Sequence, residues 1–217
     1  MSPQMIDRLL HGLLDTLTMV GASALVALAA GVPIAVLLVM TAPDGLSPAP
    51  RINRALAAVV NGFRATPFIV LLVALLPLTR LVTGTTIGVW AAIVPLSISA
   101  TPFFARIAEV SLREVDAGLI EAAQAMGCRR RQIVRHVLLP EALPGIVGGF
   151  TITVVTMIGA SAMAGAVGAG GLGDLAIRYG YQRFDTTVMA AVIVVLIALV
   201  CVVQFAGDLV VRRLSAR

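Results

Sequence analysis

The sequence contains no lysine, little charge of either sign and few aromatic residues. All 16 basic residues are arginine, 12% of the 217 residues are charged, and 5% are aromatic. A soluble domain carries about twice that charged fraction. Because the phosphate-binding loop of nucleoside triphosphatases requires a lysine, this chain cannot form one. The remainder is mostly apolar, with 59% hydrophobic residues and a mean hydropathy of +1.01, which indicates a membrane protein.

Residues that build metal, redox or catalytic sites are also scarce. Cys128 lies in an arginine-rich loop and Cys201 in an apolar run, so neither a disulfide nor a metal site is indicated. His11 and His136 lie in separate segments without clustered acids or thiols, which argues against a catalytic metal. No paired acids or activated nucleophile falls within an apolar run, so an intramembrane enzyme is not favoured.

Long uncharged runs predict the membrane-spanning helices, each of which needs roughly 20 apolar residues. The predicted spans cover about 17–40, 57–78, 86–105, 144–168 and 187–209. The second span reaches full length only if it starts near Ala57, which places Arg64 toward one end, where its side chain can extend to the lipid headgroups. The sequence therefore predicts an all-α integral membrane protein with five transmembrane helices in a single domain over residues 1–217.

Two further features concern the course of these helices. Residues 5–14 carry apolar side chains at helical spacing and predict an amphipathic helix that lies at the membrane surface and leads into the first span. Four prolines, Pro33, Pro67, Pro95 and Pro102, lie in or near spans, where we expect them to kink the helices.

The distribution of arginine predicts the orientation in the membrane. Five spans place the two termini on opposite sides, and a cytoplasmic C-terminus puts twelve arginines inside and four outside, as the positive-inside rule requires. The inner set is Arg51, Arg54, Arg64, Arg106, Arg113, Arg129, Arg130, Arg131, Arg135, Arg212, Arg213 and Arg217, and the outer set is Arg8, Arg80, Arg178 and Arg183. Contact with anionic lipid explains this excess of arginine, so nucleic-acid binding is not indicated.

The longest loop, about 106–143, follows the third span on the predicted cytoplasmic side. Residues 116–127 predict a short helix that starts at Asp116 and ends at Gly127, and a second helix over 129–138 is expected to stop at Pro140. A simple connection between two spans needs far fewer residues, so this loop favours a docking role. A charged loop that merely lies on lipid remains the alternative.

The residues of this loop resemble a known motif. Glu121-Ala122-Ala123, followed by Gly127 and Leu139-Pro140, is similar to the EAA loop of ABC-importer permeases, which in that family forms the coupling helix seated in a groove of the ATPase subunit. The one departure is Val137, where the family more often has isoleucine. The resemblance implies an ATPase-coupling role for Glu121, Ala122, Ala123, Met126, Gly127, Val137, Leu139 and Pro140.

Other segments narrow the resemblance to the methionine importer permeases, over essentially the whole chain. They are the glycine-rich run 165–173, the Tyr-Gly-Tyr of 179–181, residues 204–208 and the Arg-Ala-Thr-Pro-Phe of 64–68. The resemblance implies a type I ABC importer fold in a bacterial inner membrane. It also implies a pair of permease chains, two ATPase subunits that use ATP and magnesium, and an extracytoplasmic methionine-binding protein, with no cofactor bound by this chain.

The glycine-rich run has two further interpretations. Its spacing partly matches a dinucleotide-binding fingerprint, which requires a preceding strand, whereas here a membrane span precedes it. We instead expect an outer turn that faces the binding protein, with close backbone packing and an aromatic belt as alternative roles. The candidate residues are Gly168, Gly170, Gly171, Gly173, Tyr179 and Tyr181.

The fourth span is the candidate for the translocation pathway because it offers small and weakly polar positions. Thr156, Gly159 and Ser161 are the pathway candidates and Met163 is a candidate gate, although plain helix packing explains such residues as well. Because no pair of opposite charges lies in the spans to hold an amino acid, methionine rests on the resemblance alone, and D-methionine or other small amino acids remain open. An ion-coupled carrier is a further alternative, disfavoured because the spans are almost free of ionisable residues.

Overall fold

The computed structural model describes residues 3–215, and these are arranged as helices joined by short turns, without a strand among them. The all-α prediction is therefore confirmed. Four long helices are α1 (Pro3–Thr41), α5 (Val89–Arg113), α8 (Leu139–Ala166) and α10 (Thr186–Ser215). The shorter elements are α2 (Pro50–Ala65), α3 (Phe68–Ala74), α4 (Leu76–Thr83), α6 (Ala117–Ala125), α7 (Arg130–Ile133), η1 (Val134–Leu138), α9 (Gly171–Leu175) and η2 (Ala176–Tyr181). Arg217 lies outside the described residues.

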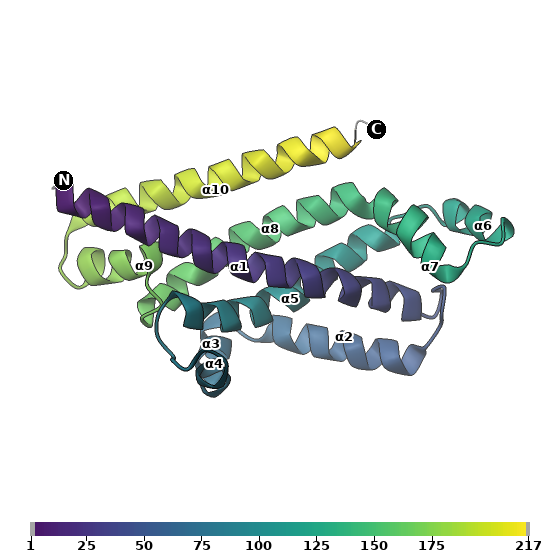
Figure 1. Ribbon diagram of the computed structural model, residues 1–217, viewed down its shortest axis with the longest axis horizontal. Helices are drawn as coiled ribbons and strands as arrows, with labels where there is room; N and C mark the ends of the chain where they lie inside the picture. Colours follow the sequence, from purple (N-terminus) through teal and green to yellow (C-terminus); the bar gives the residue numbers. More distant parts are fainter. Residues whose placement is uncertain (1–2, 216–217) are drawn as a thin grey trace.

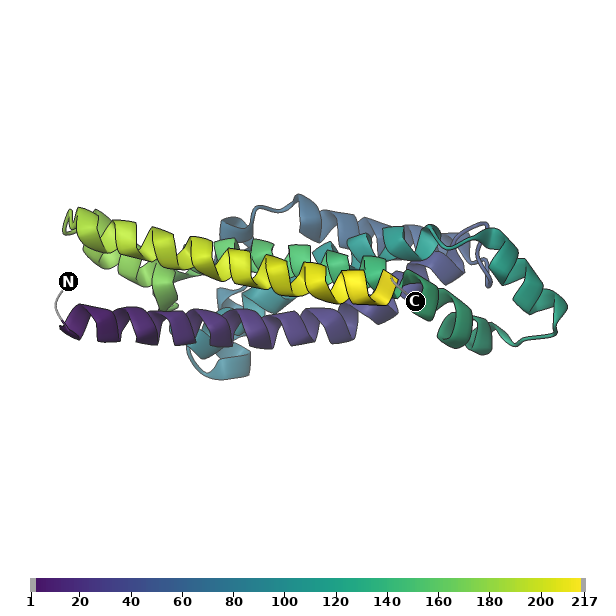
Figure 2. The same cartoon turned by 90° about the horizontal axis from the view of Figure 1, so that it is seen from above.

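The long helices run side by side along the length of the molecule (Figure 1). The N-terminus and α9 lie at one end, and α6, α7 and the turn between α1 and α2 lie at the other; we call these the α9 end and the α6 end. The view from above shows α6 and α7 projecting beyond the bundle (Figure 2). Four helices are long and apolar enough to cross a membrane, and the bent pair α2 and α3 makes up to five.

The core lies where α1, α5 and α8 meet. Phe104 of α5 is fully buried, and its ring meets that of Phe150 of α8 edge to face, with centroids 5.6 Å apart. Opposite it, α1 carries Gly31, where an added Cβ would lie 2.6 Å from the Phe104 ring. Glycine at this position therefore lets α1 approach α5 closely. By contrast, α10 is mostly exposed along its length, as expected of a helix that faces lipid.

The kink expected at Pro67 is present, and it is so sharp that the predicted second span, 57–78, is not one continuous helix. Helices α2 and α3 are bent by 104° relative to each other at Thr66 and Pro67. Pro67 has no backbone N–H and pushes the residue before it out of helical conformation, and Thr66 is indeed extended, with φ −83° and ψ 124°. Helices α3 and α4 then cross the bundle instead of running along it (Figure 1).

The other prolines do not break their helices, and the kinks expected at them stay a prediction. Pro33 lies inside α1, and Pro95 and Pro102 lie inside α5, which the structure keeps as single helices. Pro140 does not stop a helix either, because the chain continues from α7 through η1 into α8. It occupies the first turn of α8, where its missing donor is not needed, and the π-helical turn η1 precedes it. The connection between the third and fourth spans is therefore shorter than 106–143.

Residues 5–14 do not form a separate surface helix but are the first turns of α1. Leu9 is buried in a cluster with Leu172, Leu175, Val188 and Val192 from α9 and α10. The apolar face that the sequence revealed is thus used for packing within the protein. At its other end α1 is closed by the Nδ2 of Asn53, which donates to the carbonyl oxygen of Leu38 at 2.6 Å.

Candidate functional site

The first candidate site is the segment around α6, and local sequence explains its shape. The Asp116 carboxylate caps the helix by accepting from the Gly118 N–H at 2.6 Å. At the other end Gly127 has φ +76°, its N–H donates to the carbonyl of Gln124, and the N–H of Cys128 donates to that of Ala123. This pair of bonds is a Schellman motif, which glycine permits without strain. The predicted helix with its two caps is therefore present.

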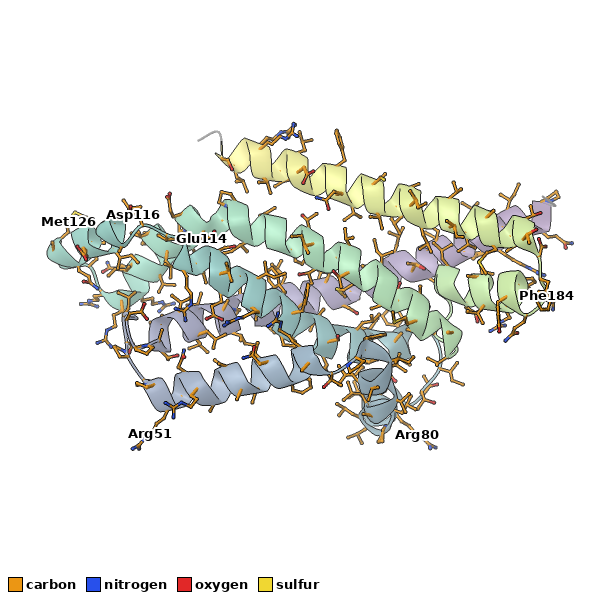
Figure 3. All side chains as sticks on the ribbon, turned by 180° about the vertical axis from the view of Figure 1, so that it is seen from behind. Arg51, Arg80, Glu114, Asp116, Met126 and Phe184 are labelled. Carbon is orange, nitrogen blue, oxygen red and sulfur yellow. The ribbon has the colours of Figure 1, made fainter. Side chains whose placement is uncertain are left out.

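The residues of the EAA segment divide between an exposed and a buried side. Glu121, Ala122 and Gly127 are exposed, as is Met126 at 76%, and Figure 3 shows Met126 at the tip of the α6 end. Ala123 is instead buried against its own chain, because the opposite face of α6 packs on the bundle. Val137 and Leu139 are half-buried and Pro140 is exposed, all on η1 and the start of α8. The structure thus brings these residues to one end of the molecule, but Ala123 does not lie on the outer surface.

Two sets of contacts stabilise the region where α5 leads into α6. Ile120 packs against a buried cluster that includes Leu112 of α5 and Leu138 of η1. Close by, Glu109 of α5 is 2% exposed and its carboxylate accepts from Arg106 at 2.7 Å and from Arg113 at 3.0 Å. A buried carboxylate needs such partners. These contacts fix the base of α5 where the α6 segment begins.

Sequence reasoning missed the turn between α1 and α2, residues 42–49, as part of this end. A cavity of about 480 Å³ lies between this turn and α6, lined among others by Asp44, Arg113 and Glu121. The Arg130 side chain donates to the Ser47 hydroxyl at 3.0 Å, and so joins α7 to the turn. Neither Arg130 nor Ser47 belongs to the EAA pattern. The only sequence signal for the turn was a polar residue, Ser47, among prolines.

A second candidate site lies between the end of α2, α5 and α8. The cavity there has a volume of about 90 Å³, and Thr156 lines it. The other lining residues are Phe63, Arg64, Thr66, Leu96, Ser99, Ala100, Phe103, Thr153, Met157 and Ala160. Gly159 and Met163 lie on the same exposed side of α8 as Thr156. Ser161 does not, because it is buried and its hydroxyl donates to the Ile158 carbonyl at 2.8 Å.

The third candidate site is the glycine-rich turn at the α9 end. Gly168, Gly170 and Gly171 have positive φ, and the Leu172 N–H donates to the Thr16 hydroxyl of α1 at 3.0 Å. Gly171 and Gly173 are buried, and an added Cβ at Gly173 would collide with the backbone of Ala162. Of the two interpretations, close backbone packing therefore describes these two glycines, and they do not face outward.

The exposed part of this end lies further along, at residues 181–184. Tyr181 and Phe184 are exposed at 67% and 82%, and Phe184 is at the tip of the α9 end in Figure 3. Tyr179 is half-buried instead, with its hydroxyl accepting from Arg8 at 2.6 Å and the guanidinium of Arg183 4.7 Å from its ring centre. Sequence reasoning missed Phe184. The signal available in the sequence was an aromatic residue close to the two tyrosines.

Among residues 3–215, no group of three or more His, Cys, Asp or Glu side chains is placed to hold a metal ion. The sites that the structure does form consist of an exposed helical segment, a small cavity between helices and an exposed loop at the α9 end. Such an arrangement can bind partners at either end and a small molecule in between.

Comparison with known proteins agrees with this arrangement. The probable D-methionine transport system permease protein MetI of Vibrio cholerae is 54% identical over 211 residues, which cover 97% of this chain and 94% of that protein. The methionine import system permease protein MetP of Bacillus subtilis is 41% identical over 83% of this chain and 82% of that protein. In the solved structure of inward-facing conformations of the MetNI methionine ABC transporter, one chain is 50% identical, with a TM-score of 0.97 over 99% of both chains. The family described as binding-protein-dependent transport system inner membrane component matches residues 28–216, and this chain therefore belongs to that family.

Proposed function

We propose that this chain is the membrane-spanning permease of an ATP-driven importer that takes up methionine. The observation that carries the proposal is the likeness to the MetNI transporter chain, at 50% identity over 99% of both chains. Relatives named as methionine permeases over most of this chain support the substrate. The chain has no lysine for a phosphate-binding loop, so ATP and magnesium are used by a separate ATPase.

In this proposal the α6 end receives the ATPase. Glu121, Ala122, Met126 and Gly127 form its exposed docking surface, and the buried Ala123 lets α6 lie close to its own bundle. Val137, Leu139 and Pro140 connect this surface to α8, so that movement of α6 reaches the fourth span. Two copies of the ATPase bind two copies of this chain, because five spanning segments are few to enclose a polar route.

The proposed orientation puts the α6 end in the cytoplasm of a bacterial inner membrane. This end holds the α1–α2 turn, the α6–α7 segment and the end of α10, and so most of the arginines of the described chain. The N-terminus and the loop 181–184 then face outside, where an extracytoplasmic methionine-binding protein docks. Tyr181 and Phe184 supply the exposed aromatic contacts there, and the buried Gly171 and Gly173 hold the loop in place.

Along the pathway we assign Thr156 and Gly159 to the exposed face of α8 that lines the route, with Met163 as a gate nearer the α9 end. A flexible thioether closes an apolar constriction and yields to a passing side chain. Ser161 belongs to helix packing in this proposal because it is turned away from that face.

The experiment is uptake of labelled methionine into liposomes that contain this chain with its cognate ATPase and binding protein. We expect uptake that requires ATP and disappears when the ATPase is inactivated. Uptake without any ATPase would identify an ion-coupled carrier and overturn the proposal. ATP-dependent uptake of another small amino acid in place of methionine would leave an importer with a different substrate.

A further inference from the structure

The wall of the second cavity includes an arginine, Arg64, whose side chain is exposed. Helix α2 starts at the α6 end and Arg64 is its fifteenth residue, so it lies roughly 20 Å along the helix at 1.5 Å per residue. It lies at the break between α2 and α3. Within the described chain its guanidinium contacts the Asn61 side chain at 3.4 Å, and no carboxylate lies within ion-pair distance of it.

An arginine in a helix pair that could form one membrane span needs an explanation. Insertion into the middle of a membrane helix costs about 2.5–3.5 kcal/mol, and such residues normally face a cavity and pair with a substrate or another charge. The structure places Arg64 at the wall of the 90 Å³ cavity. A purely structural explanation is that its charge lies near the C-terminal end of α2, where it offsets the helix dipole.

The remaining walls of the cavity supply complementary chemistry. Thr156 is exposed and its hydroxyl donates to the Ile152 carbonyl at 2.9 Å, so its oxygen keeps a lone pair that can accept. An ammonium group needs such acceptors, and a carboxylate needs the donors of a guanidinium. The other walls carry the polar Thr66 and Ser99 and are otherwise mostly apolar, with Phe63, Leu96, Phe103 and Met157.

We propose that this cavity is a binding station for the head group of an apolar α-amino acid on its way through the membrane. Arg64 binds the carboxylate, and the oxygen of Thr156 accepts from the ammonium. A volume of 90 Å³ holds roughly six water-sized groups, enough for the head group and the first side-chain carbons. The rest of the side chain lies along Phe103 and Met157. This inference rests on the proposed function, because it names where that substrate pauses.

The test uses a thiol placed in the cavity wall of the complete complex. The variant Ala160→Cys is made with Cys128→Ser and Cys201→Ser, and its alkylation by a methanethiosulfonate reagent is timed with and without L-methionine. Methioninamide, which keeps the ammonium and the side chain but lacks the carboxylate, is the matched ligand control. We expect L-methionine to slow alkylation severalfold and methioninamide to leave it unchanged.

The same measurement is then repeated with Arg64→Gln, which should abolish the protection. Uptake by this variant should show a KM roughly 10- to 100-fold higher, as expected when a charge-assisted hydrogen bond is lost. Arg80→Gln is the control because Arg80 is also in the last turn of a helix, α4, but lies outside the cavity. It should keep both protection and uptake. Arg64→Lys keeps the charge and should retain part of the protection.

Several results would overturn the proposal that the cavity binds the amino-acid head group. They are protection by methioninamide equal to that by methionine, protection that persists in Arg64→Gln, or no protection by either ligand. If Arg64→Gln fails to assemble, the comparison of the two ligands on the chain that retains Arg64 decides the question. A complex without ATP-dependent methionine uptake refutes the proposed function itself. Normal uptake together with an unaffected Arg64→Gln variant refutes only the station.

Discussion

Gly127 ends α6 in a left-handed conformation, and its replacement separates backbone conformation from side-chain contact. Gly127 has φ +76°, and an alanine in this left-handed conformation costs about 1–2 kcal/mol. Asparagine adopts the left-handed conformation more readily than alanine, and valine less readily. An added Cβ would meet nothing within 4 Å in the chain itself, so the cost is conformational. Each 1 kcal/mol lowers the ratio of capped to uncapped conformers about fivefold, since RT is about 0.59 kcal/mol at room temperature.

We therefore expect ATP-dependent uptake by the reconstituted complex to fall in the order Gly127→Asn, Gly127→Ala, Gly127→Val, with the asparagine variant nearest to the parent. ATP hydrolysis should fall less than uptake, because the change affects the segment that transmits the movement. Gly21→Ala is the control, since Gly21 is a helical glycine that also has open space around it. If asparagine were as harmful as valine, side-chain size against the ATPase would matter and the conformational reasoning would be wrong.

Three further predictions concern stability. Glu109→Gln, which turns an amide donor toward its two arginine partners, should lower the free energy of unfolding by about 2–4 kcal/mol, measured by thermal unfolding in detergent. Gly31→Val should destabilise the protein because its Cβ meets the ring of Phe104, while Gly21→Val should have a small effect; equal losses would contradict the close packing of α1 on α5. Tyr179→Leu should speed hydrogen exchange in the first turns of α1 more than Tyr179→Phe does, because leucine loses the cation–π contacts as well as the hydrogen bond.

The parts of the fold that follow from local chemistry were predictable from the sequence. Long uncharged runs identified the spanning segments, and Asp116 and Gly127 marked both ends of α6 because caps depend on residues next to them. The bend at Pro67 was predicted as well, since proline disfavours helix at the preceding residue, but the break of the span into two helices was not.

Features that depend on distant contacts were not predictable in this way. The inward position of Ala123 depends on which face of α6 meets the bundle, and an alanine carries no polarity to indicate it. Pro140 is accommodated by a π-helical turn. No local sequence pattern predicts the extra residue of such a turn. The cavity at Arg64 combines side chains from α2, α5 and α8, so it exists only once these helices have packed.

The closed turn between α1 and α2 limits how the protein can change shape. The side chain of Asn53 bonds the end of α1, the N–H groups of Ser47 and Ala49 donate to carbonyls of that helix, and Arg130 holds Ser47 from α7. With its backbone groups satisfied in this way, the turn has little freedom to act as a hinge. We therefore expect α1 and α2 to move as one rigid body, with the break at Thr66-Pro67 as the joint of this half of the molecule. A spectroscopic distance between labels on α1 and α2 would stay constant through the transport cycle, while one between α2 and α4 would change.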